Sequence, residues 1–120
     1  MYKIGYFKDK NGNSPIEDYL RKLRSKKDKD SRIKSNKILE YLDILRNSGA
    51  KAGEPYIKHL QGEIWELRPL RDRILFAAWD GEKFLLLTRF MKSTQKTPKR
   101  EIDKAIRNLA DMRERGLNDE

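Results

Sequence analysis

The sequence predicts an α+β fold in which helices pack on a mostly antiparallel sheet. Three observations lead to this prediction. Apolar residues alternate with polar ones near the N-terminus, which indicates a strand, and then recur at helical spacing in two segments. Several short apolar segments with turns between them follow, and a last segment with helical spacing closes the order β-α-α-β-β-β(-β)-α. Because the chain has 120 residues, we expect residues 1–120 to form a single domain.

The N-terminal half is predicted to form a short strand followed by a helical hairpin. Alternation over residues 2–6 indicates the strand. Ser14 can cap a helix and Pro15 suits its first turn, so the first helix should begin there. Residues 21–29 are strongly charged, and we expect them to connect the two helices. The second helix should end at Gly49, since glycine is favoured just after a helix.

The C-terminal half is predicted to form most of the sheet and a last helix. Strands are expected at residues 56–60, 64–68, 73–79 and 84–87. The last of these is apolar on both faces, which indicates a central strand covered on two sides. Thr97 should cap the final helix. The apolar stripe of this helix consists of Ile102, Ala105, Ile106, Leu109 and Met112.

The charge balance favours an anionic partner. The formal net charge is +9, which suggests nucleic acid, an anionic membrane surface or an acidic protein. The chain has no cysteine, which excludes disulfides, thiolate zinc sites and cysteine nucleophiles. We find no metal-ligand spacing, no phosphate-binding glycine loop and no apolar run that could span a bilayer. We therefore expect a cytoplasmic protein without cofactor, metal or membrane contact.

Two arginines flank the turn between the predicted strands 64–68 and 73–79. If residues 69–72 form the turn, Arg68 and Arg73 lie opposite each other, with Cβ atoms about 5 Å apart. Two guanidinium groups so close repel each other unless an anion lies between them, and a phosphate would satisfy both. The alternative is that both arginines are solvated, or that Glu66 or Asp72 neutralises them.

Two residues are candidates for proton transfer. Glu66 has the same strand parity as Arg68, so it could accept a proton from a ribose 2′-OH or form a salt bridge that orients the arginine. His59 is the only histidine, a residue type whose side chain can exchange a proton near neutral pH. The alternative for His59 is a hydrogen-bonded surface residue with no chemical role.

Further basic residues could bind RNA phosphates. Lys92 and Lys96 flank a loop after the last strand, where they could stabilise a departing oxygen. The other candidate phosphate-binding residues are Lys58, Arg71, Arg89 and Lys99. Residues 21–37 hold nine Lys or Arg against Asp28 and Asp30, so this run could also grip a large RNA. The alternative for each group is a solvated, solubilising surface.

The motif Lys58-His59-Leu60-Gln61-Gly62-x-Ile64-Trp65-Glu66-Leu67-Arg68, followed by Arg73-Ile74-Leu75-Phe76, resembles the phage-derived HigB branch of RelE-type toxins. The later segments Leu86-Leu87-Thr88-x-Phe90-x-Lys92 and Lys96-Thr97-Pro98 are similar to the closing strand and helix of that branch. The resemblance spans essentially the whole chain.

This resemblance implies a RelE-like fold and a toxin that cleaves mRNA, usually on the ribosome. It also implies a helix-turn-helix antitoxin as partner, with DNA contacted only through the toxin–antitoxin complex. Arg73 matches the arginine that contacts the scissile phosphate, Lys92 lies near the residue that assists the leaving group, and Arg68 matches another basic position. Glu66 stands where better-known members have a lysine. The C-terminal catalytic tyrosine of some members has no counterpart, since no tyrosine follows Tyr56.

The sequence therefore predicts a metal-independent endoribonuclease, the toxin of a type II toxin–antitoxin system. In this hypothesis the 2′-OH attacks the adjacent phosphate, Arg68 and Arg73 stabilise the transition state, and Glu66 or His59 assists proton removal. The first alternative is a non-catalytic RNA-binding module that uses the same cations. The second is a DNA-binding regulator, although neither helix in the first half resembles a recognition helix.

Overall fold

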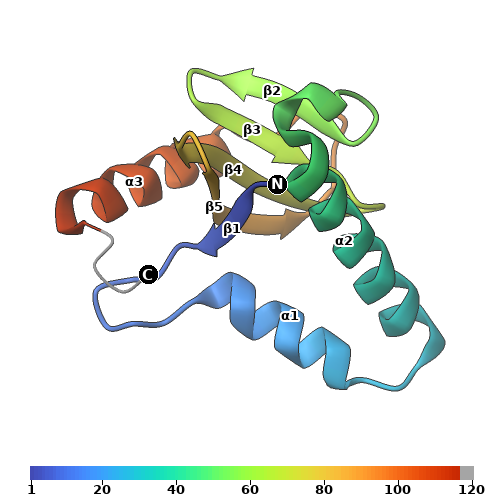
Figure 1. Cartoon of the computed structure of the whole chain (residues 1–120). Helices are drawn as coiled ribbons and strands as arrows, with labels where there is room; N and C mark the ends of the chain where they lie inside the picture. The colour runs from blue at the N-terminus through green and yellow to red at the C-terminus, as the bar shows by residue number, and fades with distance from the viewer. Residues whose placement is uncertain (117–120) are drawn as a thin grey trace.

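The computed structural model describes residues 1–116 and contains one five-stranded sheet with helices on both faces (Figure 1). The elements in chain order are β1 (Lys3–Tyr6), α1 (Pro15–Ser25), α2 (Lys29–Ser48), the short 3-10 helix η1 (Gly49–Ala52), β2 (Ile57–Gln61), β3 (Ile64–Leu67), β4 (Asp72–Asp80), β5 (Lys83–Met91) and α3 (Lys99–Arg115). This arrangement confirms the predicted α+β class and the RelE-like order of elements.

The sheet has the strand order β1-β5-β4-β3-β2. Strand β1 pairs with β5 in parallel, and the remaining neighbours are antiparallel, which confirms a mostly antiparallel sheet. The long β4 and β5 strands form the centre, so residues 84–87 lie in a covered strand as predicted. The turn between β3 and β4 and the C-terminal end of β5 therefore meet at one end of the sheet.

The sheet separates two apolar cores. Helices α1 and α2 cover one face, where Leu42 and Leu45 of α2 pack with Phe76 of β4. Helix α3 covers the other face, where Leu109 packs with Leu75 of β4. Alternate residues of β4 therefore enter different cores, as the two-residue period of a strand requires. Each buried side chain of this size contributes about 1.5–3 kcal/mol by leaving water.

The helical hairpin begins and ends where local signals predicted. The Ser14 hydroxyl accepts a hydrogen bond from the Glu17 amide at 3.4 Å and so caps α1. Helix α2 ends at Gly49, which has a φ of 61°. A Cβ atom at this position would lie 2.8 Å from the Tyr2 ring, so both the backbone conformation and the close contact favour glycine.

Three predictions about the helices were wrong. The connection between α1 and α2 is only residues 26–28, because Leu23 is buried and extends the apolar stripe of α1, while the Asp28 carboxylate caps α2. Thr97 does not cap α3; its hydroxyl bonds to another residue, described below. Ile106 is 39% exposed, since the buried positions of α3 are 105, 109 and 112. Among residues 1–116, no helix is long and apolar enough to cross a membrane.

Candidate active site

The candidate site lies at the end of the β3–β4 hairpin, on the face covered by α3. Strands β3 and β4 pair up to Leu67 and Ile74, which makes Arg68 and Arg73 the next opposed positions. Arg73 has the parity of Leu75, which packs against α3. Glu66 pairs with Leu75 and therefore points to the same face. The register thus brings together the three charged residues that the sequence had suggested.

The Arg73 guanidinium is held in place by the turn. Arg73 is only 7% exposed, and its Nη1 donates to the carbonyls of Leu70 at 2.7 Å and Asp72 at 2.9 Å. Leu70 has a φ of 57°, a left-handed conformation that costs a non-glycine residue about 1 kcal/mol or more. This strained turn directs its carbonyl at Arg73. Within residues 1–116, Nη2 and Nε of Arg73 have no hydrogen-bond partner.

Burial lowers the pKa of Arg73, the nearby Glu66 carboxylate raises it, and the neighbouring Arg68 lowers it. An arginine remains protonated at neutral pH despite such effects. The site therefore contains a fixed, partly desolvated positive charge with two nitrogens available. Such a group suits recognition of a phosphate, whose oxygens accept parallel hydrogen bonds from a guanidinium.

Glu66 supplies a negative charge beside Arg68 and Arg73. It is 2% exposed, and its Oε2 accepts a hydrogen bond from the Thr97 hydroxyl at 2.6 Å. Its Oε1 lies 3.4 Å from Nε of Arg68, whose Nη1 is also 3.9 Å from Glu54. Both carboxylate oxygens are thus engaged, which favours the alternative in which Glu66 orients Arg68.

A basic loop borders the site. The amide of Lys92 donates to the Arg71 carbonyl at 2.7 Å, and the Arg71 guanidinium donates to the Lys92 carbonyl at 2.9 Å. These two bonds fix the start of the loop beside the strained turn. Leu70, Arg71, Lys92 and Ser93 line a hollow of about 400 Å³ together with the next two residues. In the described part of the chain, Lys92 and Lys96 form no ion pair.

Lys58, Lys99 and Lys96 are three further basic residues that the sequence had suggested for phosphate binding. Lys58 pairs with Glu66 in the β2–β3 ladder and is exposed on the same face, so it extends the basic surface. Lys99 begins α3 and pairs with Asp103 at 2.9 Å, while its side chain is 84% exposed. Lys96 is exposed in the loop between Lys92 and Thr97.

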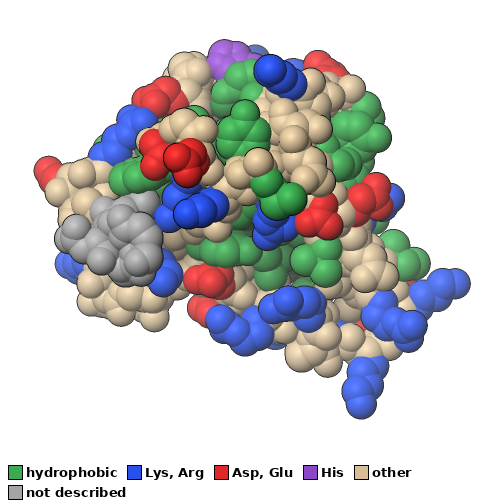
Figure 2. Space-filling view, viewed as in Figure 1, with side chains coloured by type: hydrophobic (Ala, Val, Ile, Leu, Met, Phe, Trp, Pro, Cys, Tyr) green, Lys and Arg blue, Asp and Glu red, His purple; other side chains and the backbone are tan. Residues whose placement is uncertain are grey.

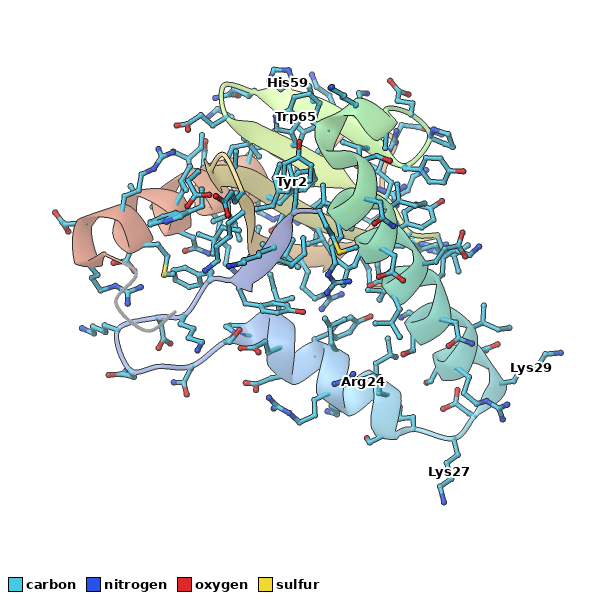
Figure 3. The ribbon with its side chains drawn as sticks, in the orientation of Figure 1. Tyr2, Arg24, Lys27, Lys29, His59 and Trp65 are labelled. Atoms are coloured by element: carbon cyan, nitrogen blue, oxygen red, sulfur yellow. The ribbon has the colours of Figure 1, made fainter. Side chains whose placement is uncertain are left out.

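The structure does not bring His59 into the site. His59 pairs with Trp65, whose side chain belongs to the core covered by α1 and α2, on the opposite face from Glu66. The two rings contact each other edge to face at the outer strand β2 (Figure 3). His59 Nε2 lies 2.8 Å from the Gly62 carbonyl. A role for His59 in proton removal at Arg73 is therefore not supported by the geometry.

Arg89 also faces away from Arg73, because the β4–β5 ladder contains a bulge. Leu75 pairs with Thr88 and Phe76 with Leu86, so one residue of β5 is unpaired and the alternation shifts. As a result Arg89 reaches the α1–α2 face, where its Nη2 is 3.4 Å from Asp72 Oδ1. Its guanidinium also stacks on the Tyr19 ring, 3.7 Å from the ring centre. The Arg89 guanidinium is thus engaged in contacts with Asp72 and Tyr19, on the opposite face of the sheet from Arg73.

The sequence named Asp72 only as a possible countercharge of the two arginines, and it did not identify Tyr19 or the contact of Thr97. Asp72 is 1% exposed and accepts a hydrogen bond from the Tyr19 hydroxyl at 2.8 Å, while its backbone carbonyl holds Arg73. It therefore links the helical hairpin to the site. A lone aspartate in a predicted turn carries no signal for such a link, and only the relative position of β4 and α1 shows it.

Comparison with known families identifies one matching family model. Residues 18–110, more than three quarters of the chain, match the family model described as phage derived protein Gp49-like (DUF891). No curated protein matches the chain significantly. Within residues 1–116, no three His, Asp or Glu side chains form a group that could hold a metal ion.

Proposed function

This chain belongs to the phage-derived Gp49-like family, which is part of the RelE/HigB-like toxin group, and on that premise we propose that it is an endoribonuclease that cleaves mRNA. In this proposal it is the toxin of a type II toxin–antitoxin pair. The membership supports a toxin, and the charged end of the sheet supports a reaction at phosphate.

The observation that carries the proposal is the geometry of Arg73. Its guanidinium is buried, is anchored through one nitrogen to two carbonyls and retains two nitrogens without partners in the described residues. An arginine that only stabilised the hairpin would be expected to use more of its donors or to pair with a carboxylate. A preorganised cation of this kind stabilises the charge that develops on a pentacoordinate phosphate.

The reaction uses the RNA itself as nucleophile. The ribose 2′-oxygen gives its proton to solvent and attacks the adjacent phosphorus, and the bond from phosphorus to the 5′-oxygen breaks. The products are a 2′,3′-cyclic phosphate and a free 5′-OH. Arg73 and Arg68 would bind the non-bridging oxygens, while Lys92, assisted by Lys96, would donate a proton to the departing 5′-oxygen. Glu66 holds Arg68 in position and is not assigned to proton removal.

The proposal includes two partners, the mRNA substrate and an antitoxin. The substrate is mRNA bound to the ribosome, and Lys58 and Arg71 would contact the backbone beside the cleaved bond. A helix-turn-helix antitoxin would neutralise the toxin, either by covering the basic surface or by keeping the toxin away from the ribosome. Expression of the adjacent reading frame together with this chain should restore growth if it encodes that antitoxin.

The test compares Arg73→Ala with the matched control Arg107→Ala, which removes an exposed arginine outside the site. We expect Arg73→Ala to abolish growth arrest and mRNA cleavage, and Arg107→Ala to retain both. Circular dichroism and a melting curve establish that each variant is folded. Because Arg73 also holds the turn, Arg73→Lys serves as a second variant that keeps the charge but loses the planar fork; it should lose most of the cleavage.

Primer extension on translated mRNA separates this proposal from the alternatives. Internal breaks that disappear with Arg73→Ala support the endoribonuclease. Protection of the RNA without breaks would instead indicate a non-catalytic RNA-binding module. Undiminished cleavage by a folded Arg73→Ala protein would refute the assignment of the site.

A further inference from the structure

The end of the α1–α2 hairpin carries a concentration of cations that the proposed active site does not use. We define the basic tip as the six exposed residues Lys22, Arg24, Lys26, Lys27, Lys29 and Arg32. Figure 2 shows Lys and Arg side chains gathered at this end of the molecule. Lys27 and Lys29 point away from the protein (Figure 3). The basic tip belongs to the layer on the opposite side of the sheet from α3 and the candidate site.

The cations of the basic tip are unpaired, whereas neighbouring cations on the same helices are paired. Arg21 contacts Asp18 at 3.0 Å, and Lys37 contacts Glu40 at 3.2 Å. Among residues 1–116, none of the six tip residues forms an ion pair with a carboxylate. The hydrogen bond from the Ser31 amide, at 3.0 Å, and to a smaller extent Lys26 lower the pKa of the nearby Asp28, so this carboxylate offsets only part of the positive charge.

Helix stability explains only two of the six cations, since Lys22 and Arg24 lie in the last turn of α1, where the helix dipole favours positive charge. Lys29 and Arg32 lie in the first turn of α2, where the helix dipole disfavours positive charge. Lys26 and Lys27 lie in the connection, outside both helices. Six unpaired cations close together also repel one another. Their concentration therefore costs stability, and an anionic partner would offset that cost.

The surface beside these residues is hollowed. A hollow of about 430 Å³ lies between the two helices and is lined by Arg24, Lys26, Arg32, Ser35 and Asn36 together with Leu23 and Leu39. The cations, the hydroxyl and the amide can donate hydrogen bonds to phosphate and ribose oxygens. The polar side chains of the hollow thus suit a sugar–phosphate backbone.

We propose that the basic tip binds the backbone of double-helical RNA at a distance from the active site and thereby holds the toxin on a structured RNA. The proposal rests on the proposed function only in that RNA is the common partner. RNA is favoured over an acidic protein because lysine is depleted from protein interfaces and aromatic anchors are enriched there. The basic tip contains four lysines and no aromatic residue.

The experiment measures binding of the full chain to a 20-base-pair RNA duplex whose 2′-hydroxyls are methylated, so that the proposed cleavage chemistry is blocked. The test variant is Lys26→Gln/Lys27→Gln/Lys29→Gln. The matched control is Lys10→Gln/Lys51→Gln/Arg107→Gln, which removes the same charge from exposed positions outside the basic tip. Affinity is measured by fluorescence anisotropy at several salt concentrations.

We expect the tip variant to bind the duplex about 10–100-fold more weakly at physiological salt. The slope of log K against log salt concentration should fall by about 2–3, since each lost phosphate contact removes about 0.9. The control variant should retain the wild-type slope. Both variants should keep the wild-type melting temperature, because all six replaced side chains are exposed.

Equal losses in the tip and control variants would overturn the proposal, because they would show that only net charge matters. Tighter binding of poly-glutamate than of the duplex, lost in the tip variant, would overturn it in favour of an acidic protein partner. If translated mRNA is not cleaved but the duplex binds through the tip, the proposed function fails while this inference stands.

Discussion

Replacement of Asp72 by asparagine tests whether the helical hairpin and the site are held together by one buried carboxylate. Asp72 is 1% exposed, and its side chain receives the Tyr19 hydroxyl at 2.8 Å and Arg89 at 3.4 Å, with Lys34 at 3.8 Å. The variant keeps the shape of the side chain but removes its charge. The Tyr19 bond can remain as a neutral hydrogen bond, while both cations lose their partner.

The expected loss of stability follows from the burial of the three groups. Removing one partner of a fully buried pair costs about 3–5 kcal/mol. The side chains of Arg89 and Lys34 are 23% and 31% exposed, so solvent screens part of the charge that is left unpaired. We expect Asp72→Asn to lower the free energy of unfolding by about 2–3 kcal/mol.

Urea unfolding followed by circular dichroism measures this loss. With a typical m value of about 1–3 kcal/mol/M, the midpoint should move by about 1–2 M. The matched control is Asp18→Asn, which breaks an ion pair with Arg21 whose side chains are 64% and 66% exposed. Such surface pairs contribute at most about 1 kcal/mol. Equal effects of the two substitutions would refute the reasoning that Asp72 links the layers.

Three further substitutions test the core, the countercharge and the pH dependence. Leu42→Ala, at a position that is 1% exposed, should lower the free energy of unfolding by about 2–5 kcal/mol in the same urea assay. Glu66→Gln should retain part of the mRNA cleavage, because Glu66 orients an arginine; complete loss in a folded variant would instead assign it to proton removal. Burial raises the pKa of both Tyr6 and Tyr19. The unfolded chain therefore ionises these tyrosines first, and stability should fall as the pH rises above about 10. The double variant Tyr6→Phe/Tyr19→Phe should flatten that fall, and unchanged alkaline melting curves would contradict the assignment.

Local signals in the sequence were sufficient where the structure depends on neighbouring residues. The cap at Ser14, the helix end at Gly49 and the covered strand at residues 84–87 are each determined within one or two turns of chain, and all were predicted. The positions of Arg68 and Arg73 on either side of the turn, just beyond the last paired residues Leu67 and Ile74, followed from the length of that turn. These features need no knowledge of how distant elements pack.

The predictions that failed concern side chains whose position depends on packing between distant elements. The bulge in β5 moves Arg89 to the face that carries Asp72, although strict alternation would place it beside Leu87 and α3. The Thr97 hydroxyl bonds to Glu66 rather than to the helix that follows it, because a buried carboxylate lies within reach. Neither contact has a signature in the sequence, since each partner is more than ten residues away.

The two arginines of the candidate site differ in whether their guanidinium groups are paired with a carboxylate. This difference predicts which of the two substitutions should reduce cleavage more. Arg68 is paired with the buried Glu66, so a phosphate must compete with a carboxylate that is 3.4 Å away. Arg73 is anchored by carbonyls that leave its remaining nitrogens open. Most of the new charge on a pentacoordinate phosphate should therefore be stabilised by Arg73. Arg73→Ala should reduce single-turnover cleavage by about 10²-fold or more, and Arg68→Ala by a smaller factor. The reverse order, in variants with equal melting temperatures, would show that Glu66 releases Arg68 when RNA binds and that Arg68 is the principal phosphate ligand.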